Sequence, residues 1–316
     1  MKRTFIALLT TMAIMLSSGA ALAAEKKNII IPGGTMGGSM YTTVTLLTNV
    51  LNKYVPELSV SARASGTKEN IFQLKGKEVE FATASGFDYW SATGEDPTKA
   101  KDVCTAVVVY QQFAPIVVQR DSAINTAADL KGKRINLCDR RTGSYTVNTH
   151  LLEVIGLTEK DIVPFYLSSS AGSAALTESR VDSVFFLTAL PAPAMSLVTN
   201  SAKGGKFIPL SDAQLDALVK KYPFYSIVDV PAERMPDLGV KGSAKVPSYG
   251  AELLVGADVP EDLVYKVVKA TMEHKDELIA GMASLSFISP ESTVKYAGMP
   301  LHPGAQRYFR EIGALK

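Results

Sequence analysis

A short strand that runs through a glycine-rich turn into a helix is the feature that most constrains this chain. The apolar run 29–31 enters Gly33-Gly34-Thr35-Met36-Gly37-Gly38-Ser39, and an amphipathic segment continues to Tyr54. Such a turn leaves backbone N–H groups free at a helix N-terminus, which is a favourable place for an anion. The simplest alternative is a turn whose glycines only permit close packing.

The spacing of this turn excludes both common nucleotide-binding motifs. A Walker loop requires a lysine directly after its last glycine, whereas Gly38 is followed by Ser39 and Met40. The dinucleotide fingerprint requires a different spacing of its glycines from the two Gly-Gly pairs found here. The expected anion is therefore not a nucleotide.

The first residues have the pattern of a secretory leader. Lys2 and Arg3 precede an apolar stretch from Phe5 to Leu16, and Ala21-Leu22-Ala23 supplies the small residues of a cleavage site. We therefore expect a signal peptide over 1–23, cleaved after Ala23, and a mature protein in the periplasm. No later segment has the length of apolar sequence needed to span a bilayer.

The charge balance indicates no polyanionic partner. The whole chain has 33 Lys and Arg against 31 Asp and Glu, and loss of the expected leader removes two cations and no acid. Basic runs interleaved with aromatic residues are absent from the sequence. We therefore expect no nucleic-acid or membrane-surface partner.

Strand and helix patterns alternate along the chain, which predicts two α/β lobes of similar size. Thr67 is expected to cap the N-terminus of one helix, and Gly156 to cap the C-terminus of another. Parallel sheets would gather ligands beyond the C-terminal ends of their strands. Strands are expected at 29–31, 58–62, 79–83, 103–110, 116–119, 134–137, 163–167, 184–187 and 251–255, with helices at 41–54, 68–75, 145–155, 172–180, 260–278 and on either side of 300–304.

The turns between these elements carry the candidate binding groups. In the first half, the turns at 35–39, 65–67 and 85–86 offer hydroxyls and free N–H groups. In the second half, Arg140 and Arg141 stand beside a Thr-Gly-Ser turn, and a guanidinium can hold a carboxylate by two parallel hydrogen bonds. Arg141 is the preferred ligand contact because it adjoins that turn, and the alternative is an exposed surface pair.

Metal, cofactor and enzyme interpretations have little support in the sequence. Cys104 and Cys138 can either pair or remain buried thiols. The three histidines are far apart, so no metal site and no cofactor is expected. Ser65-Gly66-Thr67-Lys68 matches the S-x-x-K of secreted serine acyl enzymes, but the companion motifs are missing. A serine hydrolase using Ser65 and Lys68 stays as an alternative.

An ordered set of short strings resembles the TAXI family, the solute receptors of one class of TRAP transporter. The resemblance covers essentially the whole mature chain. It is carried by 33–41, Ser65-Gly66-Thr67-Lys68-Glu69-Asn70, Asp129-Leu130-Lys131-Gly132-Lys133-Arg134, Thr142-Gly143-Ser144, Phe185-Phe186-Leu187-Thr188, Lys221-Tyr222-Pro223-Phe224-Tyr225 and Leu301-His302-Pro303-Gly304-Ala305 with Tyr308.

The resemblance implies a two-lobed, type II-like periplasmic binding protein, with a central sheet flanked by helices in each lobe and a ligand cleft between them. Residues 24–112 with 250–316 would form one lobe and 113–249 the other, with crossings near Gln112 and Tyr249. It further implies a monomer that performs no chemistry. A small anionic solute, such as glutamate or a C4/C5 dicarboxylate, would pass from it to the integral-membrane subunits of a TRAP permease. A ligand sensor with the same fold is a further alternative.

The resemblance also implies which residues line the cleft. The first lobe would contribute Thr35, Gly38, Ser39, Tyr41, Ser65, Asn70 and Ser85, and the second Thr142, Gly143, Ser144 and Thr188. Arg141 joins this set from its place beside the turn and not from the resemblance. The chain departs from the family pattern at Ser85-Gly86-Phe87-Asp88, where many members have Gln-Ser-Asp, and at the two arginines, where a small residue is common. An added arginine would favour an additional ligand carboxylate.

Overall fold

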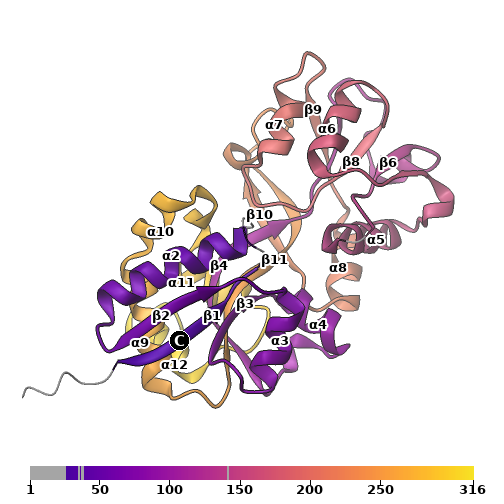
Figure 1. Ribbon diagram of the computed structural model, residues 1–316. Helices are drawn as coiled ribbons and strands as arrows, with labels where there is room; N and C mark the ends of the chain where they lie inside the picture. The colour runs from indigo at the N-terminus through magenta and orange to yellow at the C-terminus, as the bar shows by residue number, and fades with distance from the viewer. Residues whose placement is uncertain (1–25, 35, 37–38, 141) are drawn as a thin grey trace, which may run out of the picture.

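The computed structural model describes residues 26–34, 36, 39–140 and 142–316. Within them the chain forms two α/β lobes, as the sequence predicted, and its strands pair into sheets of two, four and five strands (Figure 1). The first lobe, as named here, comprises β1 to β4 with the C-terminal half of β11 and the helices that follow it. The second lobe comprises β5 to β10 with the N-terminal half of β11.

The first lobe begins with the strand, turn and helix that the sequence singled out. β1 is parallel to β2, while β3 and β4 both pair antiparallel with β11. The elements are β1 (Lys27–Pro32), α2 (Ser39–Tyr54), β2 (Leu58–Arg63), α3 (Thr67–Lys75), β3 (Phe81–Ala84), α4 (Gly86–Thr93), the 3-10 turn η1 (Pro97–Lys99) and β4 (Val103–Phe113).

The second lobe has a five-stranded sheet in the order β7-β6-β8-β5-β9, in which only β6 pairs in parallel with β7 and β8. Its elements are β5 (Ile116–Gln119), η2 (Ala127–Leu130), β6 (Arg134–Asn136), α5 (Gly143–Ile155), η3 (Glu159–Asp161), β7 (Val163–Phe165), α6 (Ser169–Thr177), β8 (Ser183–Phe185), α7 (Pro193–Thr199), β9 (Gly205–Ile208), α8 (Asp212–Lys221), β10 (Ser226–Pro231) and η4 (Ala232–Arg234).

The chain returns to the first lobe through β11 (Ser243–Gly256). This strand pairs with β10 from Ser243 to Ser248 and with β4 from Ser248 onward, so that one strand belongs to both lobes. Gln112 and Tyr249 are register partners in the second of these pairings. The lobe boundaries at residues 112 and 250 remain a prediction.

The C-terminal helices cover the first lobe. They are α9 (Glu261–Glu273), α10 (Lys275–Gly281), η5 (Ala283–Phe287), α11 (Pro290–Tyr296) and α12 (Pro303–Glu311). The single helix expected over 260–278 is in fact two, because the chain leaves helical geometry at His274. α12 packs closely on α9: a β-carbon on Gly304 would lie 2.3 Å from the carbonyl oxygen of Glu261.

The prediction that the sheets of both lobes are parallel was wrong. β1 and β2 are parallel, the sheet of β10, β11, β3 and β4 is entirely antiparallel, and the five-stranded sheet of the second lobe has both kinds of pairing. β4 and β11 run in opposite directions because β4 leaves the first lobe and β11 returns to it beside β4. Separate apolar cores lie under the two lobes: one includes Ile31, Leu47 and Phe309, and the other includes Ile116 and Leu151. Each lobe therefore has its own hydrophobic stabilisation.

Both cysteines are buried free thiols, which decides between the two alternatives left open by the sequence. Burial raises the pKa of the Cys104 thiol and of the Cys138 thiol. Among the described residues, no helix has the length and apolar character needed to cross a membrane.

Candidate functional site

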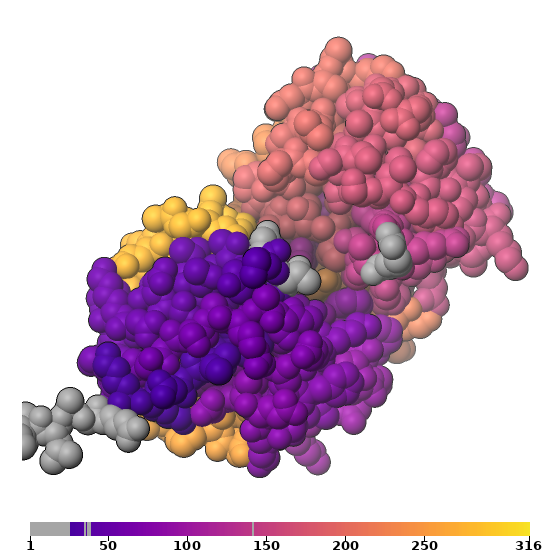
Figure 2. Space-filling view, in the orientation of Figure 1, coloured from indigo at the N-terminus to yellow at the C-terminus, as the bar shows by residue number. Residues whose placement is uncertain are grey.

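A cavity of about 630 Å³ lies where the two lobes meet, along the furrow between them in Figure 2. Both lobes contribute to its wall. The described lining residues are Gly34, Ser39, Met40, Ser65, Gly66, Thr67, Tyr110, Gln112, Leu187, Thr188, Ala189, Pro191, Pro193 and Ser284. None of these side chains carries a formal charge.

The first-lobe wall is assembled from the chain segments that follow β1 and β2. These strands are parallel, so both end at the same edge, where the Ser65 N–H donates to the Gly34 carbonyl oxygen at 3.2 Å. The buried Asn70 amide joins this turn to β3 by donating to the carbonyl oxygens of Gly33 and Thr83, each at 2.8 Å. Ser39, the first residue of α2, and Thr67, the first of α3, therefore reach one cavity.

A buried carboxyl group supports this wall from behind. Thr67 Oγ1 donates to Asp88 Oδ1 at 2.7 Å, and Ser85 Oγ donates to Asp88 Oδ2 at 2.5 Å. Burial raises the pKa of Asp88, and the two hydroxyl groups oppose that shift. Asp88 thereby fixes the orientation of the Thr67 side chain.

Among the cavity hydroxyls without a protein partner in the described residues, one belongs to a buried side chain, Tyr110, and one, Ser65 Oγ, is itself a buried atom. Tyr110 of β4 is 2% exposed, lines the cavity and makes no hydrogen bond through its hydroxyl there. Burial raises the pKa of Tyr110, which keeps it a neutral hydrogen-bond donor. Ser65 Oγ is likewise buried without a partner. Buried polar groups normally find partners, so both point to a polar ligand group.

The second-lobe wall has a different chemistry. It consists of Leu187, Thr188, Ala189, Pro191 and Pro193 in the segment that follows β8. Thr188 Oγ1 already donates to the Ala189 carbonyl oxygen at 3.1 Å. The prolines have no N–H group to offer. This wall therefore presents mainly apolar surface to the cavity.

Only some of the expected site residues line this cavity. Ser39, Ser65 and Thr188 do. Ser85 and Asn70 are fully buried and make the structural hydrogen bonds described above, while Tyr41 lies on α2 outside the lining. Thr35, Gly38 and Arg141 lie outside the described residues.

The turn at Thr142, Gly143 and Ser144 lies at the start of α5, beside an aromatic contact between the lobes. Thr142 caps α5 by accepting from the Tyr145 N–H. A β-carbon on Gly143 would lie 3.1 Å from the Phe87 ring of α4. The nearby Arg140 is paired with Glu159 at 2.9 Å, and its guanidinium lies 4.0 Å from the centre of the Tyr166 ring. Arg140 is therefore held at the surface of the second lobe.

The aromatic residues near the meeting point of the lobes divide between cavity and core. Tyr110 lines the cavity, whereas Phe87 and Trp90 of α4 pack against Phe224 with ring centres 5.4 Å apart in both cases. Phe87 also stacks on Tyr249 at 5.4 Å. Burial lowers the pKa of His150, which contacts Trp90 in the same cluster, to about 4. These rings join the lobes beside the strands that cross between them.

Sequence reasoning missed most of the second-lobe wall and the Gln112 side chain, whereas Tyr110 belongs to a group of aromatic residues that the sequence offered as a possible cleft wall. Two features of the sequence could have indicated these residues. Residues 110–112 stand just before the expected crossing between the lobes, and the run Leu-Thr-Ala-Leu-Pro-Ala-Pro follows a predicted strand.

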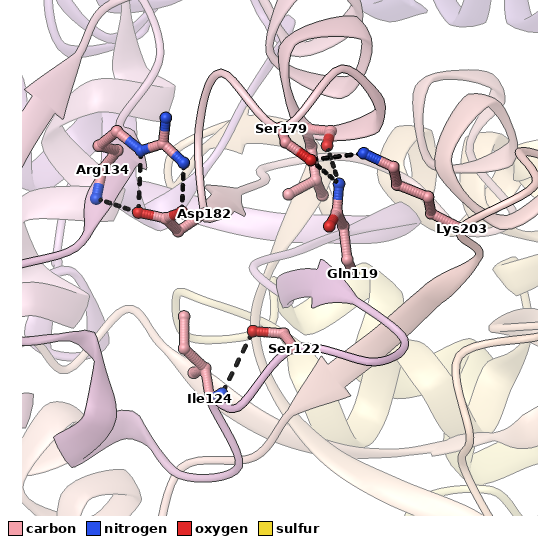
Figure 3. A network of polar contacts seen from close by, with 8 residues as sticks. Gln119, Ser122, Ile124, Arg134, Ser179, Asp182 and Lys203 are labelled. Atoms are coloured by element: carbon pink, nitrogen blue, oxygen red, sulfur yellow. Dashed lines mark hydrogen bonds and ion pairs between the residues drawn. The ribbon is translucent and has the colours of Figure 1, made fainter.

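A smaller cavity of about 470 Å³ lies at the opposite end of the second-lobe sheet. Figure 3 shows that its polar groups bind one another: Arg134 forms a two-pronged pair with Asp182, and Lys203 donates to Ser179. Arg134 is the first residue of β6 and Asp182 precedes β8, so this is the N-terminal edge of both strands. Ligand sites in such sheets form at the other edge.

Solved structures with a related arrangement are solute-binding proteins at low sequence identity. The periplasmic aliphatic sulphonate-binding protein of Escherichia coli is 16% identical, with 91% of this chain and 85% of that chain covered and a TM-score of 0.45. The L-cystine solute receptor of Neisseria gonorrhoeae is 12% identical, with 83% and 92% covered and a TM-score of 0.46.

A family model gives a more direct assignment. The model described as the NMT1-like family matches residues 31–313, nearly the whole described chain. This protein therefore belongs to the NMT1-like family.

Proposed function

We propose that this protein is a periplasmic solute-binding receptor that captures a small anionic solute and delivers it to the membrane subunits of a TRAP-type transporter. The observation that carries the proposal is a cavity lined by both lobes, with unpartnered hydroxyls at its polar wall. A ligand there contacts both lobes, so its binding can stabilise one relative position of the lobes. The TRAP permease and a glutamate-like or dicarboxylate ligand come from the sequence resemblance, and the periplasmic location comes from the expected leader over 1–23.

The hydrolase alternative has less support from the geometry. Ser65 Oγ has no hydrogen-bond partner, so within the described residues no base is in place to activate it. Lys68 is exposed on the surface of α3. An activated serine needs a base within hydrogen-bond reach.

Thermal-shift measurements followed by titration calorimetry on the mature protein test the receptor function. The panel contains L-glutamate, C4 and C5 dicarboxylates, hydroxy acids and monocarboxylates. We expect at least one acid to raise the melting temperature in a concentration-dependent way, because a ligand that binds only the folded state stabilises it. No response across the panel, together with labelling of Ser65 by a serine-reactive probe, would favour the hydrolase.

Tyr110→Phe tests whether the binding site is this cavity. Loss of one hydroxyl donor should weaken the binding of the highest-affinity acid of the panel by about fivefold, which is the usual effect of one neutral hydrogen bond. Tyr296→Phe is the matched control, because Tyr296 lies on α11 and does not line the cavity. Equal affinities of the two variants would place the ligand elsewhere. Co-purification with a membrane permease then separates a transport receptor from a sensor.

A further inference from the structure

We propose that the solute has a single oxyanion attached to a short aliphatic tail, with the oxyanion on the first-lobe wall and the tail on the second-lobe wall. This inference rests on the proposed function and narrows the ligand class. It starts from the unequal chemistry of the two walls.

The first-lobe wall is suited to one oxyanion. Ser39 and Ser65 place two hydroxyl groups there, and Tyr110 adds a third from β4, while the Thr67 hydroxyl already donates to Asp88. Ser39 is the first residue of the long helix α2, whose N-terminal N–H groups and dipole favour negative charge. The Tyr110 hydroxyl, on a side chain 2% exposed, and Ser65 Oγ, a buried atom, both lack a protein partner within the described residues. An oxyanion would satisfy both by accepting their hydrogen bonds.

The second-lobe wall is suited to an aliphatic chain. Leu187, Ala189, Pro191 and Pro193 contribute hydrocarbon, and the one hydroxyl among them, on Thr188, already donates to a backbone carbonyl. Met40 adds a flexible apolar side chain from the first lobe. Apolar surface gains free energy on contact with a ligand tail and offers nothing to a polar group.

A second carboxylate would lose hydration without receiving a countercharge from the described wall. The described lining contains no Lys, Arg or His. Arg140 is paired with Glu159, and the Arg63 guanidinium donates to Gln73 at 2.5 Å. A buried carboxylate without a countercharge is strongly disfavoured. The described wall therefore discriminates against dicarboxylates.

Matched pairs of acids of equal carbon number test this inference. Titration calorimetry on the mature protein would compare pentanoate with glutarate and hexanoate with adipate, with propanoate and butanoate extending the monoacid series. We expect each added methylene to tighten monoacid binding about fourfold, the effect of burying one CH₂ group. Each diacid should bind at least about tenfold more weakly than its monoacid, which is the effect of about 1.4 kcal/mol.

Leu187→Ala tests the placement of the tail. This substitution should weaken the binding of hexanoate by about tenfold and leave the affinity for propanoate nearly unchanged, because only the longer tail reaches that side chain. Leu197→Ala is the matched control: Leu197 is 51% exposed on α7 and does not line the cavity. Ala189→Asn is a second variant that adds a polar group to the same wall without removing packed atoms. It should reduce the gain per methylene and leave propanoate binding intact.

The outcomes separate this inference from the proposed function. Tighter binding of glutarate than of pentanoate would overturn the inference and leave the receptor function standing. A monoacid series with no dependence on tail length would do the same. If no acid of either series or of the wider panel binds, both the inference and the receptor function fail.

Discussion

Replacing Gly304 by alanine should lower the free energy of unfolding by about 3 kcal/mol, the upper range for adding a methyl group to a packed interior. The new β-carbon would lie 2.3 Å from the Glu261 carbonyl oxygen, 2.8 Å from the Tyr265 nitrogen and 2.9 Å from the Val264 β-carbon. Two of these atoms belong to the backbone of α9, so no side-chain rotation can relieve the overlap. α12 must move away from α9, and the contacts of Phe309 in the first-lobe core loosen with it.

Urea unfolding monitored by circular dichroism measures this effect. The matched control is Gly66→Ala, whose new β-carbon would meet nothing nearer than the Glu69 β-carbon at 3.8 Å. Gly66→Ala should lower the free energy of unfolding by less than about 1 kcal/mol, which is the usual effect of replacing glycine by alanine at a helix N-cap. A Gly304→Ala protein as stable as the control would show that α12 can shift without loss of packing.

Replacing Glu252 by glutamine should remove much of the loss of stability on going from pH 6.5 to pH 8. Glu252 is fully buried on β11, where it accepts hydrogen bonds from Thr105 Oγ1 and from the Gly298 N–H at 3.2 Å. Burial raises the pKa of its carboxyl group from 4.5 to about 8, and the hydrogen bonds only partly oppose this. The folded protein therefore holds this proton at neutral pH.

The direction of the pH effect follows from the two pKa values. Between the unfolded value of 4.5 and the folded value of about 8, the folded state binds more protons than the unfolded state. The contribution of Glu252 to the free energy of unfolding is fully present below pH 4.5. It is lost as the pH rises toward the folded-state pKa, by up to about 1.4 kcal/mol per pH unit. Glutamine needs no proton, so its unfolding free energy should change less over this range.

The measurement should begin at pH 6.5 because His150 acts with the opposite sign below it. The pKa of His150 is lowered to about 4 by burial, so its contribution is lost as the pH falls from 6.5. Burial also raises the pKa of Asp88, so its contribution to stability has the same sign as that of Glu252. The exposed Glu291→Gln is the control. Equal slopes in the wild type and Glu252→Gln would show that Glu252 is ionised in the folded protein.

Regular elements with strong local signals were predictable from the sequence. The helix expected at 41–54 is α2, Ser39–Tyr54, and Gly156 caps α5 in the left-handed conformation with φ 83° as expected. The α3 cap is Gly66 rather than Thr67, because Thr67 instead donates its hydroxyl to Asp88. The N-terminus of α3 therefore depends on a contact between residues distant in sequence and not on the local capping preference of Thr67.

Elements without a periodic pattern were not predicted. α4 has only eight residues, and its side chains serve two partners: Asp88 binds Thr67, while Phe87 and Trp90 contact the second lobe. α7, β9 and β10 were also missed, and so was α8, although it has a capping box of Ser211 and Gln214 and buries Leu215 and Leu218 at helical spacing. A short helix with buried residues on several sides shows no single apolar face, so helical spacing cannot reveal it.

Only the first-lobe wall of the candidate site was predictable from the sequence. Ser39 and Ser65 follow directly from the rule that strands of a parallel pair end at one edge. Leu187 and Pro191 reach the same cavity only because the two lobes are placed against each other by β4 and β11. That placement depends on long-range pairing, which no local pattern encodes.

The strand shared by both lobes also sets a limit on how early the first lobe can fold. Thr105 on β4 and its partner Glu252 on β11 are 147 residues apart, and β3 also requires β11 as its neighbour. Because β11 follows nearly all of the second lobe in the sequence, β3 and β4 cannot complete their pairing until that intervening part of the chain is in place. The closing of this long loop is an entropic cost that should slow the folding of the first lobe relative to the second.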